Sequence, residues 1–228
     1  LGLLLGIFLH FGIQAQKRDQ VRIQTQKEGY QAQVLTFLLF FFFLLLMSVR
    51  VLLLLAPGFE EIETTTPIDL LRRAEAEVIV ASTTDQHLVT GRSRITLQAD
   101  HLLSDVIAQS FDLLVLPGGP AVFELREKPR VLDLIRRFHF DGILIGAICA
   151  APLLLHDAGI LSEDTEYTAH GSTLDELPEL QTDQETIVSA NLITSRGAGT
   201  AVSFGLTLVE KLFGAEKAEE IKASIHAA

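Results

Sequence analysis

The stretch that most constrains the fold is the apolar run from Gly142 to Ile148, which leads directly into Cys149. Its length and unbroken hydrophobic character are typical of a parallel strand that is buried on both faces. Small residues and Pro152 follow at once, and a leucine-rich stretch comes next, as at the start of a helix. The sequence therefore predicts a strand that turns sharply into a helix, with Cys149 on the turn.

Cys149 on such a turn has two interpretations. The unpaired N–H groups at the start of a helix would point at the sulfur and, together with the helix dipole, favour the nucleophilic thiolate. The alternative is a buried cysteine that serves as a small hydrophobic side chain. Because Cys149 is the only cysteine, the chain has no internal disulfide, which fits a reducing compartment, and we expect a cytoplasmic protein.

Other strand-like runs alternate with helical patterns along the rest of the chain. Strands are predicted at 49–56, 77–82, 111–116, 186–189 and 192–195, with a hairpin of 88–90 and 94–97. Helices are predicted up to 73 and at 100–108, 129–138, 150–159 and 201–213. This alternation predicts a three-layer α/β sandwich with a mostly parallel sheet and right-handed crossovers. Ligands of such sheets bind beyond the carboxyl ends of the strands, so the loops at Gly58, Gly118 and Cys149 should meet in one site.

Residues 1–46 are predicted to lie outside this fold. They end in an apolar run from Val34 to Leu46, and the only methionine follows as Met47. They represent either an upstream reading-frame extension that is not native, or a hydrophobic N-terminal segment such as a signal sequence or membrane anchor. The run is short for a bilayer span and no small-residue cleavage site precedes Met47. We therefore favour the extension, and expect a single domain over 47–228 without membrane association.

The composition and motifs of the chain argue against several classes of ligand and partner. The chain has a net charge of −11 at pH 7, so it should repel phosphate backbones, and we expect no nucleic-acid partner. A single thiolate without a second cysteine or a paired histidine does not predict a metal site. The chain also contains neither a phosphate-loop pattern nor a dinucleotide-binding glycine fingerprint.

Four motifs that lie far apart in the sequence carry a family resemblance. They are residues 55–63 (LAPGFEEIE), 115–119 (VLPGG), 147–152 (AICAAP) and 192–200 (LITSRGAGT). Together they closely resemble the ThiJ/PfpI superfamily, and within it the branch of the parkinsonism-associated protein deglycase and bacterial YajL. The resemblance runs from about Met47 to the C-terminus. It implies a flavodoxin-like fold of the class I glutamine-amidotransferase type, which is usually a homodimer.

By this resemblance Cys149 is the nucleophile, and Glu63 is the acid that stays protonated and donates a hydrogen bond to the thiolate. A carboxyl group beside a thiolate in a dry site is pushed toward its neutral form by desolvation and by like charge. The alternative for Glu60, Glu61 and Glu63 is a solvated helix start, where carboxylates are common. We expect that alternative for one or two of the three, but not for Glu63.

The resemblance also implies roles for four further residues. His170 falls where the family has a histidine near the cysteine, although a loop histidine without a catalytic role fits the same sequence. The backbone N–H groups of Gly119 and Ala150 would form the oxyanion hole. Arg73 matches an arginine that the family brings to the dimer interface near the partner's site. The alternative for Arg73 is a solvated cation at the end of a helix.

The chain also departs from the family pattern at three positions. Ala150 follows the cysteine where the peptidase-like branch has a histidine, which disfavours proteolysis. Ala198 stands where close relatives often have proline, so the turn beside the pocket could be looser. An arginine of the short hairpin is missing from its aligned position, and Arg92 or Arg94 would have to replace it.

The function implied by the resemblance is a cofactor-free, cysteine-dependent glyoxalase or protein deglycase. Its substrates would be methylglyoxal-type dicarbonyls or their adducts on proteins, in defence against oxidative and carbonyl stress. The alternative is a redox-sensing chaperone that responds through oxidation of Cys149, without turnover.

Overall fold

The structure is a computed structural model that describes Tyr30, Val34, Leu35, Phe37 and residues 48–227. The chain divides into two compact units, Leu1–Ser48 and Val49–Ala228. In the first unit Tyr30, Val34, Leu35 and Phe37 are helical, and Ser48 is in neither a helix nor a strand. The predictions made for the remainder of 1–46 lie outside the described residues. Among the helices that the structure describes, none combines the length and the apolar character needed to cross a membrane.

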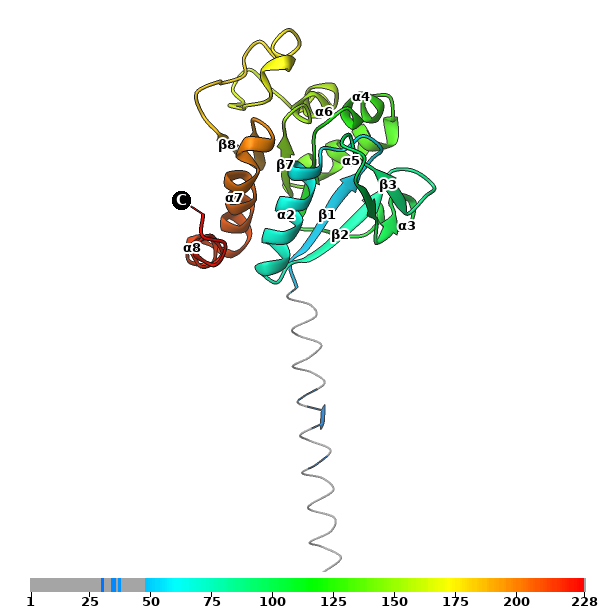
Figure 1. The fold of residues 1–228 in the computed structure, drawn as a ribbon, viewed down its shortest axis with the longest axis vertical. Coiled ribbons are helices and arrows are strands. Elements are labelled where there is room, and N and C mark those ends of the chain that lie inside the picture. Colours follow the sequence, from blue (N-terminus) through cyan, green and yellow to red (C-terminus); the bar gives the residue numbers. More distant parts are fainter. Residues whose placement is uncertain (1–29, 31–33, 36, 38–47, 228) are drawn as a thin grey trace, which may run out of the picture. The chain divides into compact units, whose positions relative to one another are not determined.

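The second unit is built around a seven-stranded sheet (Figure 1). In spatial order its strands are β5 (His101–Leu102), β2 (Glu77–Ser82), β1 (Arg50–Leu55), β6 (Leu113–Leu116), β7 (Leu144–Ile148), β9 (Leu192–Ser195) and β8 (Thr186–Ser189). All neighbouring pairs are parallel except β9 and β8. The strands β3 (Leu88–Thr90) and β4 (Thr96–Gln98) form a separate antiparallel pair.

Helices cover both faces of the sheet. One face carries α2 (Glu61–Arg73), α7 (Ala201–Phe213) and α8 (Ala215–Ser224). The other carries α3 (Leu103–Val106), α4 (Ala121–Arg126), α5 (Pro129–Phe140) and α6 (Pro152–Asp157). The short 3-10 helices η1 (Gly171–Thr173) and η2 (Ala198–Thr200) lie in the connections. The predicted three-layer, flavodoxin-like α/β sandwich with a mostly parallel sheet is therefore confirmed.

The two layers of core follow from the alternation of side chains along the central strands. In β1, Leu52 and Leu54 belong to the core beneath α4, α5 and α6, whereas Leu53 and Leu55 belong to the core beneath α2 and α7. Successive side chains of a strand point to opposite faces, so a strand covered on both sides must be apolar throughout. That is why its sequence reads as an unbroken hydrophobic run.

Two parts of the element assignment from sequence were incomplete. The predicted helix at 100–108 is wrong in extent, because His101 and Leu102 pair with the edge of β2 and only the four residues of α3 are helical. The helices α4 and α8 were not predicted. In α8 only Ala218 and Ile221 are buried, so its sequence lacks a periodic apolar face.

Gly146 in β7 lies where α7 packs against the strand. A Cβ atom there would be 2.9 Å from Phe204 Cζ and 3.0 Å from Leu208 Cδ2, and both side chains are fully buried. We expect Gly146→Ala to lower the free energy of unfolding by about 1–3 kcal/mol, measured by urea denaturation. Gly199→Ala is the control, because a Cβ there meets no atom within 4 Å. Equal stability of the two variants would contradict this packing.

Candidate active site

Three segments meet at the carboxyl ends of β1, β6 and β7: the first turn of α2, the double-glycine turn and the cysteine turn. Gly118 lies between the reactive side chains, since its N–H donates to Glu63 Oε2 at 3.0 Å. A Cβ on Gly118 would be 2.5 Å from that oxygen and 2.6 Å from Cys149 Cβ. Only a residue without a side chain fits between Glu63 and Cys149 in this arrangement.

Cys149 occupies a strained turn at the end of β7. Its φ of 66° lies in the left-handed region, which is uncommon for residues other than glycine. Two backbone hydrogen bonds of 2.8 Å hold it: Cys149 N–H donates to Ser195 O, and His170 N–H donates to Cys149 O. The half-buried sulfur interacts with the N–H groups of Gly119 and Ala150. The structure therefore brings together the predicted nucleophile and both predicted oxyanion donors.

Glu63 reaches this sulfur from the first turn of α2. Its side chain is 1% exposed and hydrogen-bonds to Cys149 as well as to Gly118. Burial raises the pKa of Glu63 to about 7, and the charge of Glu60 adds to this effect. The hydrogen bonds and the positive charge of Arg92 act in the opposite direction. Glu63 can therefore gain and lose a proton near neutral pH.

The pKa of the Cys149 thiol differs from the expectation of a favoured thiolate. Burial first, and then the carboxylate of Glu63, raise this pKa to about 12, although the N–H groups of Gly119 and Ala150 act in the opposite direction. The helix α6 has only six residues, so its dipole offsets little of this cost. Between about pH 7 and pH 12 the Glu63–Cys149 pair holds one proton, and a thiolate forms when Glu63 carries it.

The solvated helix start that we expected for one or two of the glutamates is wrong, because Glu60, Glu61 and Glu63 are all buried. Glu60 Oε2 accepts from the N–H of Glu63 at 2.8 Å and so caps α2. Glu61 Oε1 accepts from the N–H of Ser93 at 2.7 Å. Glu60 thus fixes the turn that carries Glu63, and Glu61 fixes the turn that carries Arg92.

His170 lies near the pair, beside Gly197. The position of a Cβ on Gly197 is 3.6 Å from His170 Cδ2, 3.7 Å from Glu63 Oε1 and 3.9 Å from Cys149 Cβ. The Nδ1 atom of His170 accepts from Ser172 N–H at 3.2 Å. In the neutral ring the proton is therefore on Nε2, and the exposed imidazole can act as a donor.

Arg73 is not brought to the site within the described residues. It is exposed at the end of α2, ten residues after Glu63, which is about 15 Å along the helix axis. Its Nε atom pairs with Asp69 Oδ2 at 2.8 Å. Its place in a dimer interface stays a prediction. Of the two hairpin arginines, Arg92 is the one whose charge acts on Glu63.

Two buried hydroxyl groups beneath the site were not singled out from sequence. Ser195 Oγ lies 2.7 Å from Thr200 Oγ1, and Thr200 Oγ1 accepts from Gly197 N–H at 3.2 Å. This pair fixes the glycine turn beside His170. A serine and a threonine that flank a glycine turn directly after an apolar strand are the signal that could have indicated it.

Among residues 48–227 and the four described residues before them, no group of three or more His, Cys, Asp or Glu side chains is arranged to hold a metal ion.

Gly118→Ala should disable the site without unfolding the domain. The added methyl group would displace either the Glu63 carboxyl group or the Cys149 side chain, because both lie within 2.6 Å of its position. We expect alkylation of Cys149 by iodoacetamide to change at least about tenfold in rate, since the pKa of the thiol depends on Glu63. Gly199→Ala serves as the control, and an unchanged alkylation rate in Gly118→Ala would contradict the geometry.

Comparison with known proteins places this site in a family. The DJ-1/PfpI family model matches residues 49–211. Protein DJ-1 homolog A of Arabidopsis thaliana is 37% identical over 175 residues, which are 75% of this chain but 45% of that protein. The chain thus spans less than half the length of that relative.

Two other proteins match over nearly their whole length. The Caenorhabditis elegans protein named glutathione-independent glyoxalase DJR-1.2 is 35% identical over 174 residues, which are 75% of this chain and 92% of that protein. The crystal structure of Drosophila melanogaster DJ-1beta superposes with a TM-score of 0.75 at 36% identity, covering 79% of this chain and 99% of that one. The chain therefore belongs to the DJ-1/PfpI family.

Proposed function

We propose that this protein is a glyoxalase that converts methylglyoxal-type dicarbonyls into hydroxy acids, with Cys149 as the nucleophile. The observation that carries the proposal is the contact between Glu63 and Cys149 beside the N–H groups of Gly119 and Ala150. A nucleophile, a proton carrier and two oxyanion donors are the groups that addition to an aldehyde requires. The glyoxalase name of the Caenorhabditis elegans relative supports the same reaction.

The reaction begins when the Cys149 sulfur bonds to the aldehyde carbon of methylglyoxal. The aldehyde oxygen takes up the negative charge, which the N–H groups of Gly119 and Ala150 stabilise. The former aldehyde carbon then loses its hydrogen as a proton and the neighbouring ketone carbon gains one. One carbon is oxidised and the other reduced by the same electron pair, so a lactyl thioester forms without an external oxidant. Water finally breaks the carbon–sulfur bond and releases lactate and the thiol.

Glu63 is the proposed carrier for these proton transfers. A general acid or base works best when its pKa is close to the working pH, and burial brings the pKa of Glu63 to about 7. His170, with its proton on Nε2, is the second candidate, since its ring and the Glu63 carboxyl group both lie within 4 Å of the Cβ position of Gly197. Together they would allow one group to remove a proton while the other donates one.

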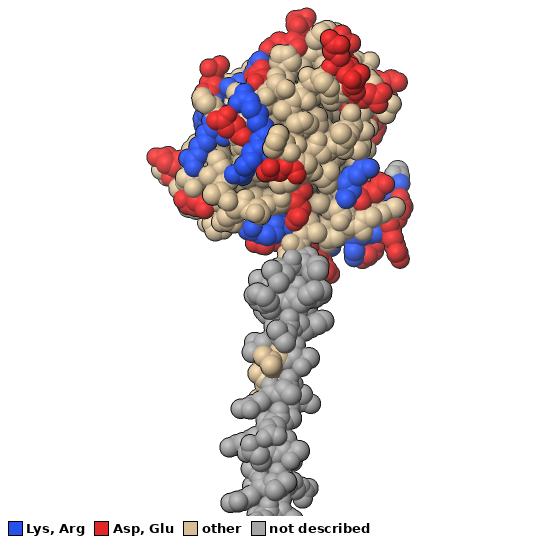
Figure 2. All heavy atoms as spheres, turned by 180° about the vertical axis from the view of Figure 1, so that it is seen from behind, with Lys and Arg blue, Asp and Glu red and all other residues tan. Residues whose placement is uncertain are grey.

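The charges around the site favour a neutral substrate. We call residues 162–183 the His170 segment; it contains no Lys or Arg, and its acidic residues are Glu163, Asp164, Glu166, Asp175, Glu176, Glu179 and Asp183. Asp and Glu side chains are prominent along the upper edge of the domain in Figure 2. A negative field repels anionic metabolites but not methylglyoxal, which has no charge.

Lactate formation from methylglyoxal by the purified full chain tests the proposal. In buffer without glutathione, lactate detected by NMR should accumulate in proportion to protein concentration. A glycated peptide offered in its place tests the extension to protein adducts. If the folded chain forms no lactate, the glyoxalase proposal is wrong, and oxidation of Cys149 by peroxide becomes the reaction to follow for the redox-sensing alternative.

A further inference from the structure

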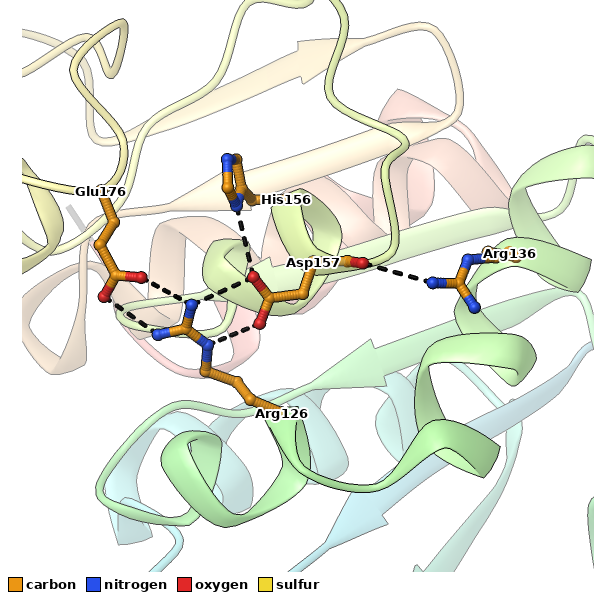
Figure 3. Close-up of polar contacts among 5 residues, drawn as sticks. All are labelled: Arg126, Arg136, His156, Asp157 and Glu176. Atoms are coloured by element: carbon orange, nitrogen blue, oxygen red, sulfur yellow. Dashed lines mark hydrogen bonds and ion pairs between the residues drawn. The ribbon is translucent and has the colours of Figure 1, made fainter.

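Arg126 forms ion pairs with two carboxylates from other segments of the chain, those of Asp157 and Glu176 (Figure 3). Its Nε and Nη2 atoms donate to the two carboxylate oxygens of Asp157, at 2.6 and 3.0 Å. Its Nη1 and Nη2 atoms donate to the two carboxylate oxygens of Glu176, at 3.0 and 2.6 Å. The side chains of Arg126 and Asp157 are both 20% exposed, so water screens their pair less than a surface pair.

The three residues come from the three segments that carry the site residues. Arg126 ends α4, which begins directly after Gly119 and Pro120. Asp157 ends α6, which begins three residues after Cys149. Glu176 follows His170 in the His170 segment. One guanidinium group therefore joins the double-glycine turn, the cysteine turn and the His170 segment.

Other contacts hold the fixed side of this arrangement. Arg136 of α5 donates from Nε to Ala158 O at 2.9 Å and from Nη2 to Asp157 O at 3.3 Å. The end of α6 is thus anchored to α5 independently of Arg126. Asp157 therefore holds Arg126 from the anchored end of α6, and Glu176 is the partner that the His170 segment contributes to the same guanidinium group.

The His170 segment contains little regular structure of its own. Apart from η1 the structure gives it no helix or strand. Leu177 and Leu180 are buried in the core, and before His170 the N–H of Thr168 donates to Thr194 Oγ1 at 3.0 Å, so the segment is held on the domain on both sides of His170. Burial of the leucines fixes how closely the segment approaches the core, but it allows the segment to shift along the surface of the core. A guanidinium–carboxylate pair with two hydrogen bonds, in contrast, admits essentially one planar arrangement.

We propose that Arg126 is a positioning residue that sets the place of His170 beside Cys149 by holding Glu176 against Asp157. Its catalytic consequence rests on the proposed glyoxalase function, whereas its effect on the His170 segment does not. The amide of His170 reports on both, because its N–H donates to Cys149 O at 2.8 Å.

Glu176→Gln is the test variant, and Glu220→Gln is its matched control. The glutamine amide would place a donor against a donor of Arg126 and so break the double hydrogen bond. Glu220 forms an ion pair of 2.7 Å with Lys217 inside α8, so the control makes the same chemical change away from the site. Arg126→Lys is a third variant, since lysine keeps the charge but can pair closely with only one carboxylate at a time.

Hydrogen exchange and steady-state kinetics of these variants give separate readouts. In Glu176→Gln we expect the His170 amide to exchange about tenfold faster. We expect kcat for lactate formation to fall about tenfold or more, with KM within about twofold, because His170 is displaced while substrate binding stays. Arg126→Lys should give intermediate values for both, and Glu220→Gln should match the unmutated chain.

The outcomes separate this inference from the proposed function. Unchanged exchange at His170 in both Glu176→Gln and Arg126→Lys would overturn the inference. A raised KM with unchanged kcat would overturn it too, because it would show a binding role in place of positioning. If the unmutated chain forms no lactate but Glu176→Gln still accelerates exchange at His170, the glyoxalase proposal fails and the positioning of His170 stands.

Discussion

Cys149→Ser should reduce lactate formation from methylglyoxal at least about 10³-fold. Serine has nearly the same shape, and its backbone meets the same strain at a φ of 66°. Its hydroxyl group, however, is far less acidic than a thiol, and Glu63 with a pKa of about 7 is too weak a base to ionise it. The variant would therefore bind the aldehyde without attacking it. Lactate measured by NMR over a range of protein concentrations checks the result.

Folding of the serine variant must be verified beside its activity. Its free energy of unfolding in urea should lie within about 1 kcal/mol of the unmutated chain, because no cavity is made and no bulk is added. Turnover above one-tenth of the original rate would show that another group is the nucleophile. Peroxide treatment of both proteins, followed by mass measurement, would show in addition whether Cys149 is the residue that takes up oxygen.

Glu63→Gln should make the protein inactive and, at alkaline pH, more stable. Loss of the proton carrier should lower kcat by about 10²–10⁴-fold. The pKa of Glu63 in the folded chain is about 7, above its ordinary value of 4.5. The folded state therefore holds a proton that the unfolded state releases, so its stabilising effect is complete below pH 4.5 and is lost as pH rises through 7.

Glutamine has no charge to bury, so the variant should escape this loss of stability. At pH 8 we expect Glu63→Gln to exceed the unmutated chain by about 1–3 kcal/mol in free energy of unfolding, and at pH 5 by less than about 1 kcal/mol. Urea denaturation at the two pH values measures the difference, with the exposed Glu220→Gln as a control that should show none. A stability difference that does not grow between pH 5 and pH 8 would mean that Glu63 is not a buried titrating acid.

Much of the fold could be predicted from local patterns. The strands at 77–82, 186–189 and 192–195 and the helix at 201–213 have the predicted bounds. The spacing of buried positions can be recognised in the sequence. A strand covered on both faces must be apolar at every position, and an amphipathic helix must be apolar at every third or fourth position. Where that pattern is weak, as in α8, the sequence did not reveal the element.

The sequence also placed Cys149, Gly119 and the three glutamates after strands that end at the same edge of a parallel sheet, while the choice of Glu63 among the glutamates came from the family resemblance. What the local pattern could not supply was their environment. Three adjacent glutamates look alike in sequence, yet Glu60 caps α2, Glu61 binds the backbone of Ser93 and Glu63 reaches the sulfur.

The sequence by itself thus determined the layers of the fold, the turn that carries Cys149 and the family to which the chain belongs. Only the tertiary structure decided that Glu63 titrates near pH 7, that the thiol is less acidic than a helix start suggests, and that Arg126 joins three segments. The physical reason is that the spacing of apolar residues along a strand or helix is a local property of the chain. A pKa or an ion-pair network instead depends on charges and dipoles contributed by residues distant in sequence, which only folding brings within a few ångströms.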